Sequence, residues 1–116
     1  MPTSKNIGTR KDEIAESLVK IIDSGLKEIF GEHAASIIYS YMEKNLSLRK
    51  QEIPARIGEF KKGLRTFLST GAYVVEKTVL KKLYRSYGLE FEEKESYDFE
   101  DYLEELKRKV KDEIKG

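Results

Sequence analysis

Glu76 is the ionisable residue whose position in the sequence is hardest to reconcile with exposure to solvent. It lies within residues 70–89, TGAYVVEKTVLKKLYRSYGL, the longest strongly apolar stretch of the chain. At about 100° per residue, a helix places Glu76 on the same arc as Ala72, Val79 and Leu80. A buried carboxylate must be paired, hydrogen-bonded or protonated. We therefore expect Glu76 to be mostly buried and bound by a basic or hydroxyl group.

Three interpretations of Glu76 follow. In the structural one, the carboxylate pairs with Arg65 or Lys62 on the preceding helix, or with a tyrosine hydroxyl, and Arg65 is the first candidate. In the functional one, Glu76 contacts a ligand or carries a proton in a pocket, with Arg65 and Tyr41 as the other members of the candidate site. In the third, Glu76 lies at a partly exposed edge of the helix. The structural interpretation is favoured because buried charges are usually paired.

His33 is the one histidine of the chain, and there is no cysteine. A metal site would need a second imidazole or a carboxylate cluster, and Glu32 and Glu43 have no known ligand spacing. There is no phosphate-binding glycine motif and no HExxH motif, and a histidine expected to lie exposed does not favour a Ser-His-Asp triad. We therefore expect a protein that is not an enzyme and that has no metal and no cofactor.

The composition is typical of one globular domain of 116 residues, long enough to bury a core. Charged residues make up 37% of the chain, but the net charge is +1. No apolar run approaches the roughly 20 residues of a membrane span, and the N-terminus has no apolar signal region, so we expect a cytoplasmic protein without membrane contact. One Gln and two Asn occur among many Lys and Glu residues, which is typical of heat-adapted proteins.

The spacing of apolar residues predicts an all-α fold, a compact bundle of five helices over residues 10–30, 32–45, 54–68, 71–87 and 98–114. We expect the bundle to pack around the strongly apolar fourth helix, about residues 71–87. Pro54 is expected to start the third helix and Phe67 to lie on its buried face, while Gly88 ends the fourth. Residues 1–8 are polar and aperiodic, which predicts a flexible tail before a single helical domain over residues 9–116.

Charge is distributed unevenly along the chain. Residues 49–85 contain ten Lys or Arg and three Glu, whereas residues 90–105 contain nine acidic residues and one Lys. One interpretation is a basic patch for nucleic acid or an acidic partner, formed by Lys61, Lys62, Lys77, Lys81, Lys82 and Arg85. The favoured interpretation is that the acidic segment folds over the basic helices and neutralises them, within one chain or in a dimer.

The last predicted helix has a narrow apolar stripe formed by Phe99, Leu103, Leu106 and Val110. A narrow stripe suits a helix laid over the body of the fold, or one side of a helix pair between two chains. The second of these interpretations predicts a homodimer.

Three motifs follow one another over residues 26–91: FGEHAASIIYSYMEK, then EIP with Phe60 six residues beyond Pro54, then GAYVVEKTVLKKLYRSYGLEF. This order resembles the small helical domain of archaeal signalling proteins known as the Nitrosopumilus output domain, fifth type. The matching positions are Gly31, Ile38, Tyr39, Met42, Glu43, Ile53, Pro54, Gly71, Ala72, Glu76, Lys77, Leu83, Tyr84, Gly88 and Leu89. The chain departs from the family pattern at Tyr41, where a histidine is frequent, and at Leu68 and Ser69, where Phe-Gly is frequent.

The resemblance implies an all-helical output or regulatory module and brings no catalytic residues with it. The resemblance, the absence of catalytic motifs and the narrow apolar stripe of the last helix together lead to one hypothesis. The chain is a non-enzymatic regulatory or protein-interaction module of an archaeal signalling or transcription system, and it forms a homodimer. The alternative is nucleic-acid binding through the basic face of the third and fourth helices.

Overall fold

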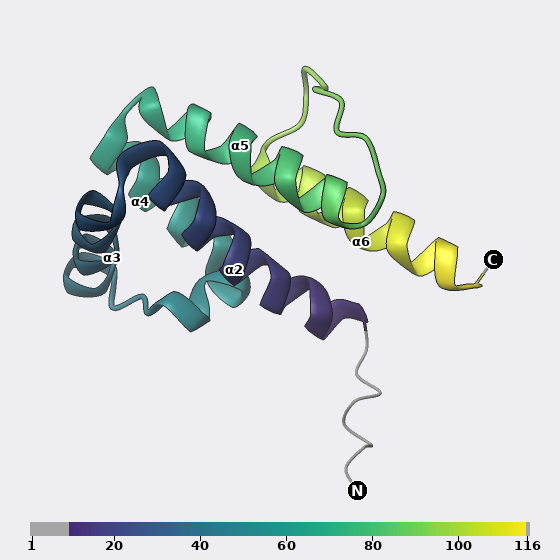
Figure 1. Ribbon diagram of the computed structural model, residues 1–116, viewed down its shortest axis with the longest axis horizontal. Helices are drawn as coiled ribbons and strands as arrows, with labels where there is room; N and C mark the ends of the chain where they lie inside the picture. Colours follow the sequence, from purple (N-terminus) through teal and green to yellow (C-terminus); the bar gives the residue numbers. More distant parts are fainter. Residues whose placement is uncertain (1–9, 116) are drawn as a thin grey trace, which may run out of the picture.

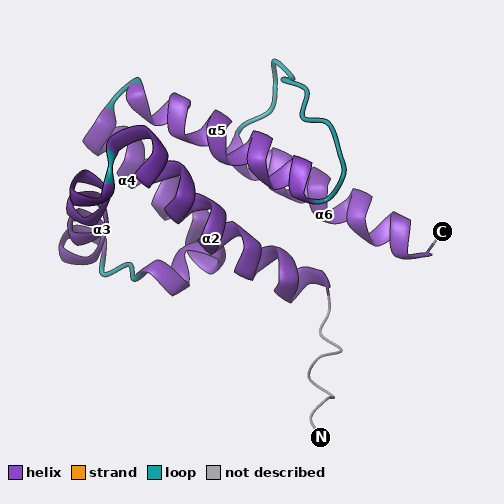
Figure 2. Ribbon diagram, in the orientation of Figure 1, coloured by secondary structure: helices purple, strands orange, loops and turns teal. Residues whose placement is uncertain are grey.

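Every regular element in the described part of the chain is a helix (Figures 1 and 2). The computed structural model describes residues 10–115, so the expected flexible tail, residues 1–8, lies outside the described residues. The elements are α2 (Arg10–Phe30), α3 (Glu32–Leu46), the 3-10 helix η1 (Lys50–Arg56), α4 (Ile57–Leu68), α5 (Gly71–Ser86) and α6 (Phe99–Lys115). The predicted all-α bundle of five α-helices is therefore confirmed. Within this range, each helix is too short or too polar to cross a membrane.

The third α-helix begins at Ile57, so the prediction that Pro54 starts it was wrong. Pro54 lies inside η1, where the tighter 3-10 turn buries Ile53. The backbone of Arg56 then leaves helical geometry, with φ −126° and ψ 44°. Its guanidinium donates to the carbonyl oxygens of Leu46 and Ser47, each at 2.8 Å. The contact of Arg56 with the end of α3 therefore fixes the junction between η1 and α4. The spacing of apolar residues along the sequence cannot predict this contact.

Gly88 ends α5 as predicted. Its φ of 74° is in the left-handed region that glycine adopts without strain. The amide of Gly88 donates to the carbonyl of Arg85 at 2.9 Å, and the amide of Leu89 donates to the carbonyl of Tyr84 at 3.0 Å. This pair of bonds is the Schellman arrangement, which satisfies the last carbonyls of the helix. It directs residues 90–98, the connector, back along α5 toward the start of α6 (Figure 2).

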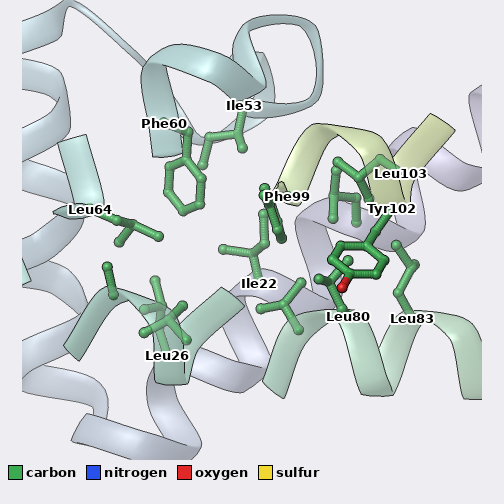
Figure 3. Close-up of a cluster of buried hydrophobic side chains, with 14 of the residues drawn as sticks. Ile22, Leu26, Ile53, Phe60, Leu64, Leu80, Leu83, Phe99, Tyr102 and Leu103 are labelled. Atoms are coloured by element: carbon green, nitrogen blue, oxygen red, sulfur yellow. The ribbon is translucent and has the colours of Figure 1, made fainter. Parts of the chain in front are cut away.

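Apolar side chains from the helices meet in one core (Figure 3). The members labelled there come from α2, η1, α4, α5 and α6: Ile22, Leu26, Ile53, Phe60, Leu64, Leu80, Leu83, Phe99, Tyr102 and Leu103. Burial of this apolar surface is the main term that stabilises such a bundle. The core also includes the apolar stripe of α6, which packs inside the chain and forms no free face.

The centre of the bundle is shared by α5 and α2. Helix α5 packs against α2, α4 and α6, and α2 also packs against α3, η1 and α6. Two glycines let the helices approach closely. A Cβ on Gly25 of α2 would lie 3.4 Å from Cγ2 of Val79, and a Cβ on Gly63 of α4 would lie 2.7 Å from Sδ of Met42. Gly63 thus weakens α4 locally but allows α3 and α4 to pack tightly.

Candidate functional site

Glu76 is buried, with 6% of its surface exposed, and Arg65 is its partner, both as predicted. Arg65 Nε donates to Oε2 of Glu76 at 3.0 Å, and Nη2 donates to Oε1 at 2.9 Å. The two residues lie on either side of the turn between α4 and α5. The guanidinium also stacks over the ring of Tyr73, with 4.7 Å from Cζ to the ring centroid. This two-point contact satisfies both carboxylate oxygens, as the structural interpretation requires.

Asp98 extends the Arg65–Glu76 pair to the connector. Its Oδ1 accepts from Nη2 of Arg65 at 2.8 Å, and its Oδ2 accepts from Nζ of Lys61 at 2.6 Å. Lys61 also donates to Oε1 of Glu100 at 2.7 Å. The hydrogen bond from Lys61, with that from Arg65, holds the pKa of Asp98 well below its ordinary value. The acidic segment therefore binds the basic helix α4 within one chain.

Glu105 on α6 is a second buried carboxylate, with 7% of its surface exposed. Its Oε1 lies 2.7 Å from the hydroxyl of Tyr84, and its Oε2 pairs with Nζ of Lys94. Burial by itself would raise the pKa of the Glu105 carboxyl. The hydrogen bonds that the carboxylate accepts from Lys94 and Tyr84 lower this pKa by more than burial raises it, so the net shift is downward. Spacing along α6 could not predict the contact with Tyr84, because that partner lies on another helix.

A cavity of about 310 Å³ opens beside Glu76, between α5, the connector and the start of α6. Its lining combines aromatic rings with charged groups: Arg65, Tyr73, Glu76, Lys77, Leu80, Phe91, Glu93, Lys94, Glu95, Tyr97, Asp98, Phe99 and Tyr102. The rings of Phe91 and Tyr97 lie 4.9 and 5.0 Å from the ring of Tyr102, so the aromatic wall is continuous. This volume is at the small end of the ~300–1,000 Å³ range of small-molecule sites.

Tyr41, the third member of the predicted buried polar site, does not join it. Its ring is half-buried on α3 and lies 4.7 Å from the ring of Phe67. Phe67 itself is 40% exposed, so the prediction that it faces the core was wrong. The spacing of apolar residues along α4 could not show that α3 covers only one side of this ring. The pair belongs to a different surface, at the α3 end of the molecule.

That surface contains the large exposed apolar residues of the described chain: Ile37, Phe67, Tyr73 and Val74, which are 40–55% exposed. They come from α3, the end of α4 and the start of α5, which lie at the same end of the molecule (Figure 1). They also come from the two longest runs of the sequence without Lys, Arg, Asp or Glu, residues 33–42 and 66–75. We call Ile37, Phe67 and Val74 the uncharged surface, because Tyr73 lines the cavity beside Glu76 and has Arg65 over its ring.

Three residues of the predicted basic patch are neutralised inside the chain, and for two of them, Lys61 and Lys77, the partner lies in the acidic segment, as the favoured interpretation expected. Besides Lys61, Lys77 pairs with Glu93 of the connector at 2.5 Å, and Lys82 pairs with Glu28 of α2 at 2.7 Å. The others are Lys62, Lys81 and Arg85, which form no salt bridge with another described residue. The patch that remains for an external anion is therefore smaller than the sequence suggested.

The predicted dimer stripe does not face outward. Phe99, Leu103, Leu106 and Val110 are each at most 4% exposed, because α6 lies across α2, α4 and α5. Of the two interpretations left open by the sequence, the helix laid over the body of the fold is therefore confirmed. A dimer through this stripe is excluded unless α6 detaches.

The described residues contain no cluster of three or more His, Cys, Asp or Glu that could hold a metal ion. A second hollow, a groove of about 660 Å³, runs between α2, η1 and α6. Ile14, Leu18 and Leu103 line it, and Glu16, Lys20 and Lys107 are among its charged residues. Among the described residues, the lining of each hollow contains no Ser, Thr, Cys or His side chain.

Comparison with known proteins adds no family to this description. No family model, no curated protein and no solved structure matches the chain.

Proposed function

We propose that this chain is a non-enzymatic regulatory or output module that forms a homodimer through the uncharged surface. The observation that carries the proposal is the exposure of Ile37, Phe67 and Val74. Apart from Tyr73, the other large apolar residues of the described range are buried or partly buried. Grouped exposed apolar side chains on a small domain are typical of an interaction site. The sequence resemblance to helical output domains of archaeal signalling proteins supports the regulatory role.

A second copy of this chain is the occupant that the charge pattern favours. In a two-fold dimer the same patch meets itself, so any charge near the axis faces a like charge. Lys, Arg, Asp and Glu make up 37% of the sequence, yet the runs 33–42 and 66–75 contain none of them. Depletion of charge together with enrichment of aromatic residues is the composition of interface centres. Tyr41 and Phe67, with ring centroids 4.7 Å apart and ring planes tilted by 36°, form an aromatic pair there.

The test is the molar mass of the full chain in solution, measured by light scattering coupled to size exclusion. We expect a dimer for the wild type and a monomer for Val74→Glu, because two carboxylates would be brought together at the interface. Val74 is 54% exposed and lies in the first turn of α5, which has no acidic residue. The helix dipole stabilises a negative charge at this end of a helix, so we expect the variant to stay folded. The matched control is Gln51→Glu on η1, an exposed position away from the uncharged surface, which should remain a dimer.

Two results would contradict the proposal. One is a wild-type monomer at high micromolar concentration, and the other is a Val74→Glu dimer as stable as that of the wild type. The alternative of nucleic-acid binding rests on Lys62, Lys81 and Arg85, which are not paired with described acidic residues. A monomer that shifts duplex or single-stranded nucleic acid at low salt, with affinity falling steeply as salt rises, would favour that alternative.

A further inference from the structure

The cavity beside Glu76 has the chemistry of a site for an organic cation. Five tyrosine or phenylalanine rings line it: Tyr73 from α5, Phe91 and Tyr97 from the connector, and Phe99 and Tyr102 from α6. The face of an aromatic ring is negative and attracts a cation that approaches within about 6 Å of the centroid. We propose that this cavity binds an alkylated ammonium compound, with the connector as its outer wall.

The cavity already holds cations against its rings. Nζ of Lys94 lies 4.9 Å from the centroid of Tyr97, and Cζ of Arg65 lies 4.7 Å from the centroid of Tyr73. Arg65 is fixed by Glu76 and Asp98, whereas the side chain of Lys94 is 40% exposed and reaches in from the connector. Lys94 therefore occupies the position on Tyr97 that a ligand ammonium would take.

The charges of the lining also favour a cation. Glu76, Glu93, Glu95 and Asp98 line the cavity, against Arg65, Lys77 and Lys94. Glu95 makes no salt bridge with another described residue, so its carboxylate is available to an incoming charge. An ammonium with methyl groups fits better than a metal ion, because five of the lining residues carry aromatic rings. The described carboxylates also form no cluster that could hold a metal ion, which would require several oxygen ligands.

Displacement of Lys94 need not leave Glu105 unpaired. Nζ of Lys109 lies 4.0 Å from the same Oε2 atom of Glu105, one helical turn along α6. The hydroxyl of Tyr84 remains 2.7 Å from Oε1. A ligand that replaces Lys94 on Tyr97 therefore exchanges one cation for another and leaves the buried carboxylate bound.

Choline is the probe, and 3,3-dimethylbutan-1-ol, its uncharged analogue, is the matched control ligand. Titrations of the full chain are followed by NMR of the tyrosine ring signals, at constant ionic strength. We expect saturable shifts with choline at millimolar concentration and about five- to thirtyfold weaker binding of the neutral analogue, the ratio that one cation–π contact of ~1–2 kcal/mol gives. Equal binding of the two compounds, or no saturable shift at high millimolar choline, would overturn the proposal.

Three variants locate the site, with far-UV circular dichroism to confirm the fold of each. Tyr97→Leu should weaken choline binding about tenfold, and Tyr41→Leu, a tyrosine outside the cavity, should leave it unchanged. Lys94→Met removes the internal competitor and should strengthen choline binding several-fold. If Lys94→Met leaves choline affinity unchanged or weakens it, choline does not bind the cavity as proposed. This result decides the question even if Tyr97→Leu does not fold. The dimer experiment has a separate readout, so either idea can fail alone.

Discussion

Arg65 binds both oxygens of the Glu76 carboxylate, at 2.9 and 3.0 Å, and the two residues differ in how much they depend on each other. Glu76 is 6% exposed and has Arg65 as its ionic partner. Arg65 is 29% exposed at its side chain and also binds Asp98. Removal of the arginine would therefore leave a buried charge without a counter-charge, whereas removal of the glutamate would leave Arg65 paired.

This asymmetry predicts unequal costs for two variants. Arg65→Met should lower the free energy of unfolding by about 3 kcal/mol, the usual cost of a buried charge left unpaired. Glu76→Leu should cost less than about 1 kcal/mol, because a well-packed apolar group often replaces a buried ion pair without loss. Chemical denaturation of both variants measures the difference. Arg85→Met, at an exposed arginine of α5, is the control and should change stability by no more than ~0.5 kcal/mol. A larger cost for Glu76→Leu than for Arg65→Met would contradict this account.

Asp98 predicts how stability depends on acid. Its pKa in the folded chain is lowered chiefly by the hydrogen bond from Lys61, while in the unfolded chain the pKa is about 3.9. A carboxyl with a depressed folded pKa contributes stability above its unfolded pKa, and this contribution is lost as pH falls through the folded value. We expect the wild type to lose stability steadily below about pH 4. Asp98→Asn should be less stable at neutral pH and should show a shallower loss in that acidic window.

Thermal melts between neutral pH and pH 2 compare the two chains. Glu104→Gln is the control, since Glu104 is 64% exposed at its side chain and meets only Lys107, at 3.7 Å, among its described salt bridges. Its melting curve should follow the wild type at each pH. If Asp98→Asn shows the same acid dependence as the wild type, the Asp98–Lys61 contact does not stabilise the fold in solution.

At Gly63 we expect side-chain packing to outweigh the low helix propensity of glycine. Alanine is favoured over glycine by about 1 kcal/mol inside a helix. At Gly63, however, the added Cβ would lie 2.7 Å from Sδ of Met42 and 2.8 Å from Cδ1 of Leu46. We expect Gly63→Ala to lower the free energy of unfolding by about 1 kcal/mol, since overpacking of a core costs ~1–3 kcal/mol.

Gly71 provides the matched control for that substitution. A Cβ at Gly71 would meet Leu68 Cβ at 3.6 Å, which is an ordinary contact. Gly71→Ala at the start of α5 should therefore leave stability unchanged or raise it by up to ~1 kcal/mol. Equal effects of the two substitutions in urea denaturation would show that α3 and α4 are not closely packed at Gly63.

The hydrogen bonds of the Tyr84 hydroxyl to Tyr102 and Glu105 are expected to stabilise the fold. Its hydroxyl lies 2.7 Å from both the carbonyl oxygen of Tyr102 and Oε1 of Glu105, and burial raises its pKa above the ordinary value. Tyr84→Phe should lower the free energy of unfolding by ~1–3 kcal/mol, because the one hydroxyl hydrogen that these two buried acceptors share is lost. Tyr73→Phe, at a residue that is 55% exposed, is the control and should be nearly neutral. Equal melting temperatures for the two variants would contradict the prediction.

The sequence by itself determined the helices, the end of α5 at Gly88, and the burial of Glu76 with Arg65. These depend on periodicity, on local capping chemistry and on partners brought together by a short turn, all of which are encoded by nearby residues. The tertiary structure alone decided the start of α4, the exposure of Phe67, the internal burial of the α6 stripe, and the pairing of Glu105 with Tyr84 and Lys94. Each of these features depends on which helix, distant in the sequence, packs on a given face. The periodicity of one helix shows that a face is apolar, but it does not show which element covers that face.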